Sequence, residues 1–190
     1  MTGTAGTAGT AETATTDRDR AWQVAAAVPD PELPMLTLAD LGVLAGVEVD
    51  GGSGTVTAWL TPTYSGCPAV AEMAADVDRR LRAAGYPDVR VRLRLDPPWS
   101  TDLITAEGRR RLAEAGIAPP HPTSAVAAGS APGPVALTLG PTRTGAVAPV
   151  TCPHCGDGDT EELSRFGSTA CKALWRCRAC REPFERVKEI

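Results

Sequence analysis

The chain has 190 residues, 43% of them hydrophobic but only 4% aromatic, and its formal net charge is −4. This length allows one ordinary domain and a small module, and it excludes two full-sized domains. The slight acidic excess argues against a protein that binds nucleic acid through broad electrostatic attraction. Because the sequence lacks an apolar stretch of about 18 residues and a secretory signal, we expect a cytoplasmic protein with no membrane-spanning helix.

The first 117 residues predict a disordered tail followed by a small α+β domain. Residues 1–16 are almost wholly Thr, Ala and Gly, which cannot bury enough surface to offset the entropy lost on ordering. From residue 17 onward, hydrophobic periodicity and turn residues predict helices and a three-stranded sheet. The expected helices cover residues 17–28, 68–84 and 105–115, and the expected strands cover residues 43–49, 55–60 and 89–95.

The composition changes again after residue 117. Residues 118–149 contain seven prolines, four glycines and a single charged side chain, Arg143, which is typical of a linker. Residues 150–190 follow as a separate small module. We therefore expect four parts: a tail (1–16), an α+β domain (17–117), a linker (118–149) and a last module (150–190), which its two C-x-x-C pairs identify as a zinc ribbon.

Two C-x-x-C pairs mark that last module as a metal site. Each pair can place two thiolates on one tight turn, and two such turns facing each other complete a tetrahedral site. Zinc is the expected metal, although the spacing also allows iron or an iron–sulfur cluster. The predicted ligands are Cys152, Cys155, Cys177 and Cys180.

Two further residues lie near these four cysteines. His154 lies inside the first pair and is interpreted as a surface residue or as a hydrogen-bond donor to a ligand, because four thiolates already fill the site. Cys171 is either a small buried side chain or a reactive thiol beside Lys172, and composition favours the first interpretation. The module carries seven acidic and seven basic residues, so it is not a basic surface suited to nucleic acid.

Cys67 is a second candidate site because it precedes Pro68 at the expected start of a helix. The unpaired backbone N–H groups and the dipole of a helix N-terminus stabilise a thiolate, which would make Cys67 a better nucleophile or metal ligand. The alternative is a buried structural cysteine that caps the helix. Asp30, in the proline-rich loop Pro29–Pro34, is likewise either a functional acid or a loop-capping carboxylate.

Several blocks of sequence together resemble a known family. The blocks at residues 30–34 (DPELP), 40–42 (DLG) and 61–68 (TPTYSGCP) are similar to the α+β domain of iron–sulfur cluster assembly factors. With residues 97–102 (PPWSTD) and 166–174 (FGSTACKAL) added, the whole resembles the PaaD (PaaJ) family of accessory subunits of the phenylacetyl-CoA epoxidase system.

The resemblance implies a non-catalytic subunit that helps to mature or maintain an iron or iron–sulfur centre in phenylacetate catabolism. The implied partners are the oxygenase or reductase subunits of that system. Neither nucleic acid nor a membrane is an expected partner. Whether the chain forms a homodimer is left open by the sequence. The implied cofactors are structural zinc and a transient iron or iron–sulfur cluster. The family's motif cysteine and motif acid fall on Cys67 and Asp30, and Cys171 lies within the most distinctive ribbon block.

Two other function classes remain as alternatives from the residues themselves. A zinc ribbon can be a nucleic-acid- or protein-binding module, although the balanced charge of this one argues against nucleic acid. An enzyme with Cys67 as nucleophile would need a general base, and neither histidine lies near Cys67 in the sequence.

Overall fold

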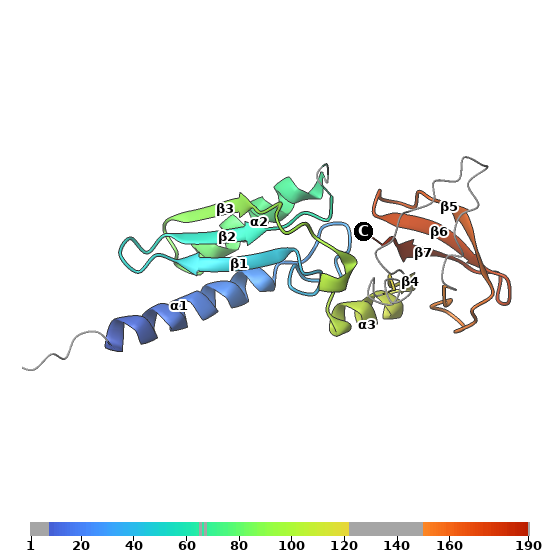
Figure 1. The fold of residues 1–190 in the computed structure, drawn as a ribbon, viewed down its shortest axis with the longest axis horizontal. Coiled ribbons are helices and arrows are strands. Elements are labelled where there is room, and N and C mark those ends of the chain that lie inside the picture. The colour runs from blue at the N-terminus through green and yellow to red at the C-terminus, as the bar shows by residue number, and fades with distance from the viewer. Residues whose placement is uncertain (1–7, 65, 67, 122–149, 190) are drawn as a thin grey trace, which may run out of the picture. The chain divides into compact units, whose positions relative to one another are not determined.

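The structure is a computed structural model that describes residues 8–64, 66, 68–121 and 150–189 (Figure 1). Two compact units divide the chain, residues 1–108 and residues 109–190. The first unit is a mixed helix and sheet domain, and the second is built around a small, mostly antiparallel sheet. This arrangement is the predicted α+β class with a ribbon module.

The first unit combines a β-hairpin with a β-α-β crossover. Strands β1 (Leu44–Val49) and β2 (Val56–Leu60) are antiparallel, and β3 (Val89–Leu93) pairs in parallel with β2. Helix α2 (Ala69–Ala83) connects β2 to β3, as a parallel connection requires. The strand order is therefore β1-β2-β3, and all three strands lie within two residues of their predicted bounds.

One face of this sheet is covered by helices. Helix α1 (Ala8–Ala26) contacts β1 and α2, and α2 contacts β3. The strand β2 alternates between buried Val56, Ala58 and Leu60 and less buried Thr57 and Trp59, which is the two-residue period of a half-covered sheet. The predicted apolar face of α2 is confirmed, because Met73, Val77 and Leu81 are all buried.

Helix α1 begins earlier than the sequence predicted. We expected a disordered tail as far as residue 16, but residues 8–16 belong to α1. Ala21 and Ala25 are fully buried and fix the later half of the helix on the sheet. Adding residues to an existing helix costs far less than nucleating one, and the added segment contains alanine, the best helix former.

Two short elements follow β3. The 3-10 helix η1 (Thr101–Leu103) leads into α3 (Ala106–Glu114), which crosses the boundary between the units. Thr105 caps α3, since its side-chain oxygen accepts a hydrogen bond from the backbone N–H of Gly108 (2.9 Å).

The second unit is a four-stranded sheet in the order β4-β7-β6-β5. Its strands are β4 (Ile117–Ala118), β5 (Thr160–Ser164), β6 (Lys172–Cys177) and β7 (Pro183–Val187). Strands β5, β6 and β7 form the expected antiparallel ribbon, whereas β4 pairs in parallel with β7. The core of this sheet consists of Ala118, Val150, Cys152, Ala173, Trp175, Cys177 and Phe184.

The start of the expected linker is therefore part of the ribbon. Ala118 lies in β4 and is almost fully buried. His121 donates its backbone N–H to Glu189 Oε1 (3.2 Å), and the carbonyl of Pro120 accepts a hydrogen bond from Arg109. Residues 122–149 lie outside the described residues, and the predicted domain boundaries stay a prediction.

Candidate metal centre and motif loops

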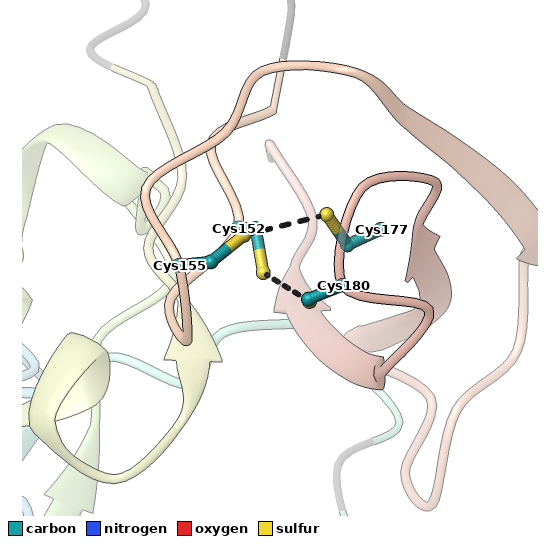
Figure 2. Close-up of side chains that lie close together, drawn as sticks. All are labelled: Cys152, Cys155, Cys177 and Cys180. Atoms are coloured by element: carbon teal, nitrogen blue, oxygen red, sulfur yellow. Dashed lines mark hydrogen bonds between the residues drawn. The ribbon is translucent and has the colours of Figure 1, made fainter.

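The four predicted ligands come together in one cluster (Figure 2). The sulfur atoms of Cys152 and Cys180 are 3.8 Å apart, those of Cys155 and Cys177 are 3.6 Å apart, and all four lie within 4.8 Å of one another. A tetrahedral zinc ion bound at about 2.3 Å by each sulfur requires sulfur–sulfur distances of about 3.8 Å. The two shorter sulfur pairs match this spacing, so the four-cysteine cluster suits a tetrahedral zinc ion.

Two tight turns hold these cysteines in place. In the first, the backbone N–H of Gly156 donates to Cys152 O (2.9 Å), and Gly156 adopts the left-handed conformation (φ 76°). In the second, the backbone N–H of Cys177 donates to Glu182 O (3.1 Å), and Arg181 adopts the same left-handed conformation (φ 68°). Each turn thus ends in a left-handed residue directly after its second cysteine.

Within the second turn the thiolate form is favoured at Cys177. At Cys180, by contrast, a backbone hydrogen bond from Glu182 is outweighed by burial and by the neighbouring cysteine sulfurs, which raise the thiol pKa. The backbone N–H of Cys180 is the main cause that lowers the pKa of the Cys177 thiol from 9.0 to about 7. Cysteine binds metals as the thiolate, so this hydrogen bond prepares Cys177 for zinc. A zinc ion held by four thiolates would fix the two turns against each other and has no open position for a substrate.

Neither His154 nor Cys171 belongs to the cluster. His154 is exposed, and a Cβ placed on Gly116 would lie 3.1 Å from its Cε1 atom, so the imidazole packs against that glycine. The Cys171 sulfur lies 3.1 Å from Thr169 Oγ1, and the Cys171 carbonyl accepts a hydrogen bond from the backbone N–H of Lys188. Cys171 is half-buried, and any functional role for it stays a proposal.

The distinctive block at residues 166–174 forms a loop and the start of β6, and Glu185 binds residues of both parts. Glu185 Oε2 pairs with Lys172 Nζ (2.8 Å), and Glu185 Oε1 accepts the backbone N–H of Ser168 (2.6 Å). A Cβ on Gly167 would lie 2.7 Å from that same Oε1, which accounts for the glycine. Burial raises the pKa of Glu185, but the hydrogen bonds from Lys172 and Ser168 outweigh it and lower the pKa overall.

Replacing Lys172 with methionine should destabilise the ribbon by about 2–3 kcal/mol. The Lys172 side chain is 5% exposed and that of Glu185 is 24% exposed, so the substitution leaves a partly buried carboxylate without its cation. Chemical denaturation of zinc-loaded protein measures this loss, and Arg165→Met, at an exposed position in the same module, serves as the control. Adding Glu185→Gln to Lys172→Met should recover part of the loss. Equal stability of Lys172→Met and Arg165→Met would contradict a stabilising Lys172–Glu185 pair.

Asp30 is buried and shapes the proline-rich loop. Its Oδ1 atom accepts the backbone N–H groups of Glu32 (2.9 Å) and Leu33 (2.8 Å), as in an Asx turn. This geometry is the loop-capping role that the sequence left open. It does not test whether Asp30 has a further role.

The Asp30 loop follows α1, and backbone hydrogen bonds connect its start to the end of β2, where the segment that leads to Cys67 begins. A ladder of backbone hydrogen bonds connects them: Thr61 N–H donates to Val43 O, Val43 N–H to Leu38 O, and Leu38 N–H to Val28 O, at 2.8–2.9 Å. Thr61 begins the segment that leads to Cys67, and Val28 directly precedes the Asp30 loop. Cys67 itself lies outside the described residues.

The two remaining motif blocks pack against each other. Trp99 is buried and donates its indole N–H to Leu41 O (2.9 Å). Gly42 has a φ of +68°, and a Cβ placed on it would lie 2.6 Å from both Leu103 Cβ and Leu103 O. Asp40 Oδ2 accepts the backbone N–H (3.0 Å) and the hydroxyl (2.9 Å) of Thr37. These motif residues therefore have structural explanations.

Gly42→Ala should cost about 2–4 kcal/mol of folding free energy, because it combines left-handed strain with a steric clash. Gly54→Ala is the matched control, since Gly54 has a similar φ of +70° and a Cβ placed on it would have no other atom within 4 Å. We expect a loss of about 1 kcal/mol for that control, from strain alone. Urea unfolding of both variants distinguishes the two effects, and equal losses would rule out the clash.

Comparison with known proteins identifies both parts of the chain. Residues 18–96 match the family model described as iron-sulfur cluster assembly protein, and residues 139–188 match the PaaD zinc beta ribbon domain. The chain is 42% identical over 169 residues to a subunit of the "Putative 1,2-phenylacetyl-CoA epoxidase" of Escherichia coli (strain K12), covering 89% of this chain and 91% of that protein. The chain belongs to the PaaD family. The resemblance seen in its motifs is thereby confirmed.

One solved structure supports the α+β fold class. A crystal structure of a domain of unknown function (DUF59) from Bacillus anthracis matches with a TM-score of 0.50 at 24% identity, over 54% of this chain and 96% of that one. A Mycobacterium tuberculosis protein associated with Fe-S complex assembly and repair is 30% identical, with a TM-score of 0.31, over 60% and 94% of the two chains. Within the part of the PaaD-family chain that the structure describes, no helix has the length and apolar character needed to cross a membrane.

Proposed function

We propose that this PaaD-family chain is a non-catalytic accessory subunit of a phenylacetyl-CoA epoxidase system. Its task would be to assist the maturation or maintenance of an iron or iron–sulfur centre in the oxygenase or reductase. The observation that carries the proposal is that the chain is 42% identical to the Escherichia coli epoxidase subunit and covers 91% of that protein. Residues 18–96 of the chain also match an iron–sulfur cluster assembly domain. The oxygenase and reductase subunits are the proposed partners.

The geometry of the four-cysteine cluster supports a structural role for the ribbon. A zinc ion bound by four thiolates has no open coordination position, so it can neither activate water nor bind a substrate. Two of the ligands, Cys152 and Cys177, also belong to the buried core of the ribbon. The zinc would hold this small module together, while the metal handled for a client protein would be bound elsewhere.

We assign that second task to Cys67, supported by Asp30. Asp30 fixes its loop through two backbone N–H groups, and backbone hydrogen bonds connect the start of that loop to Thr61, where the segment that leads to Cys67 begins. Helix α2 begins at Ala69, so its N-terminus would favour a thiolate two residues earlier in the chain. A thiolate there can bind iron transiently.

Metal analysis of protein purified without oxygen tests this proposal. We expect a single zinc per chain together with additional iron, and an absorption spectrum with sulfur-to-iron charge-transfer bands that zinc alone cannot produce. Colourless protein that holds zinc only, even after exposure to ferrous iron and sulfide, would support a structural ribbon without iron handling.

A further inference from the structure

The residue after each second cysteine differs between two otherwise similar turns. Gly156 and Arg181 both adopt the left-handed conformation, with φ of 76° and 68°. Glycine adopts it without cost, whereas an L-residue with a side chain loses about 1–2 kcal/mol. Among the described non-glycine residues, Arg181 is the only one with a positive φ. Strain of this kind at one position suggests that its side chain has a use.

The Arg181 side chain lines a surface hollow of about 390 Å³ beside the cysteine cluster. The other lining residues are Glu161, Arg176, Cys177 and Arg178. Three of the five lining residues are therefore arginines, drawn from the end of β6 and from the second cysteine turn. The lining contains no aromatic ring.

Two of the arginines already hold a carboxylate in this hollow. Arg176 donates through its Nε (3.0 Å) and Nη2 atoms to Glu161 Oε1, and Arg178 donates through Nη2 (3.0 Å) and Nε (3.2 Å) to Glu161 Oε2. Arg176 foremost and then Arg178 lower the pKa of Glu161. Asp159 lies farther from Arg178, at 3.5 Å. The hollow thus already binds one carboxylate through paired N–H groups.

Arg181 differs from its two neighbours because it has no such partner. Among the described residues it makes neither an ion pair nor a side-chain hydrogen bond, and it is exposed. The three guanidinium groups also make no hydrogen bond to a cysteine sulfur within the described part of the chain, so they are not used to fix the metal ligands. A strained, exposed arginine beside two arginines that bind a carboxylate is placed to receive a second one.

We propose that this hollow is a docking site for an acidic segment of a partner protein, in which Arg181 binds an incoming carboxylate. A carboxylate fits better than a nucleotide, since the lining offers no ring on which a base could stack. The identification of that partner as an epoxidase component rests on the proposed function. The binding of a carboxylate by Arg181 does not depend on the proposed function.

Binding of a fluorescently labelled poly-glutamate peptide to the zinc-loaded full chain tests this site. We expect binding at low ionic strength that weakens with added salt, and a roughly threefold to tenfold weaker affinity for Arg181→Gly. The same variant should keep its zinc and unfold at an equal or higher temperature, because glycine relieves the backbone strain. A merely structural role for Arg181 predicts the opposite change in stability.

Arg165→Gly is the matched control, because it removes the same charge from an exposed position in the same module. It should bind the peptide nearly as wild type does. Equal weakening of both variants, no peptide binding at low salt, or preferential displacement of the peptide by polyuridylate or inorganic phosphate would each overturn the proposal. These outcomes are independent of any iron found at Cys67, so failure of this site and failure of the proposed function can be told apart.

Discussion

Replacing Cys177 with serine should unfold the ribbon unit while the helices and sheet of the first unit stay folded. The ribbon core contains seven residues, and Cys152 and Cys177 are two of them. So small a core supplies little stability, whereas zinc binding by four-cysteine modules is worth about 10 kcal/mol or more at neutral pH. Loss of one thiolate therefore removes most of the free energy that folds this unit.

Amide hydrogen exchange on the full chain measures the effect by region. Protection should disappear in β5, β6 and β7 and persist in β1, β2 and α2. Cys171→Ser is the control, since Cys171 lies in the same module but outside the cluster, and it should retain zinc and protection. A Cys177→Ser protein with a protected ribbon would contradict a metal-dependent fold.

Acidification should release the zinc, because protons compete with the metal for the cysteine thiolates. The folded-state pKa of Cys177 is depressed below its ordinary value, so the stability it contributes is lost as the pH falls through the folded value. The raised pKa values of Cys155 and Cys180 act in the opposite direction until zinc binds their thiolates. Bound zinc competes with those protons and moves release to lower pH. Zinc affinity measured against a chelator should therefore fall steadily as the pH is lowered.

Replacing Cys67 with serine should abolish the benefit of this chain to the epoxidase without affecting its own fold. Serine is close to cysteine in size but does not provide a thiolate for iron. In cells, epoxidase activity should fall to the level found when the chain is absent. The purified variant should keep its zinc and its unfolding midpoint, because α2 is held by the buried residues Met73, Val77 and Leu81.

Cys171→Ser again provides the comparison in cells. It removes a half-buried thiol from the ribbon, and we expect epoxidase activity close to that of wild type. Wild-type activity with Cys67→Ser would show that Cys67 has no part in the function. Loss of activity with both variants would extend the functional role to Cys171.

Local patterns predicted much of this structure. The spacing of the two C-x-x-C pairs was sufficient to predict the metal cluster, because each pair sets the geometry of its own turn. A two-residue period of apolar side chains identified the strand with buried Val56, Ala58 and Leu60. A helical period identified the helix with buried Met73, Val77 and Leu81. In all these cases the determinant lies within a few residues.

Features that depend on distant residues could not be predicted in this way. Strand β4 has two residues and exists because β7 lies beside it. The pair of Lys172 and Glu185 depends on the register of β6 against β7, which the sequence of neither strand reveals alone. The sequence did contain a signal that Arg181 is unusual. The residue after Cys155 is a glycine, whereas the equivalent residue after Cys180 is an arginine.

The most direct test of the account is the iron content of the oxygenase and reductase subunits isolated from cells that carry Cys67→Ser. We predict that the iron per polypeptide of at least one of them falls relative to cells with the wild-type chain, while the variant chain itself keeps its zinc. Full iron content in both client proteins, with the variant chain folded and zinc-loaded, would contradict the proposal that Cys67 serves the maturation or maintenance of a metal centre.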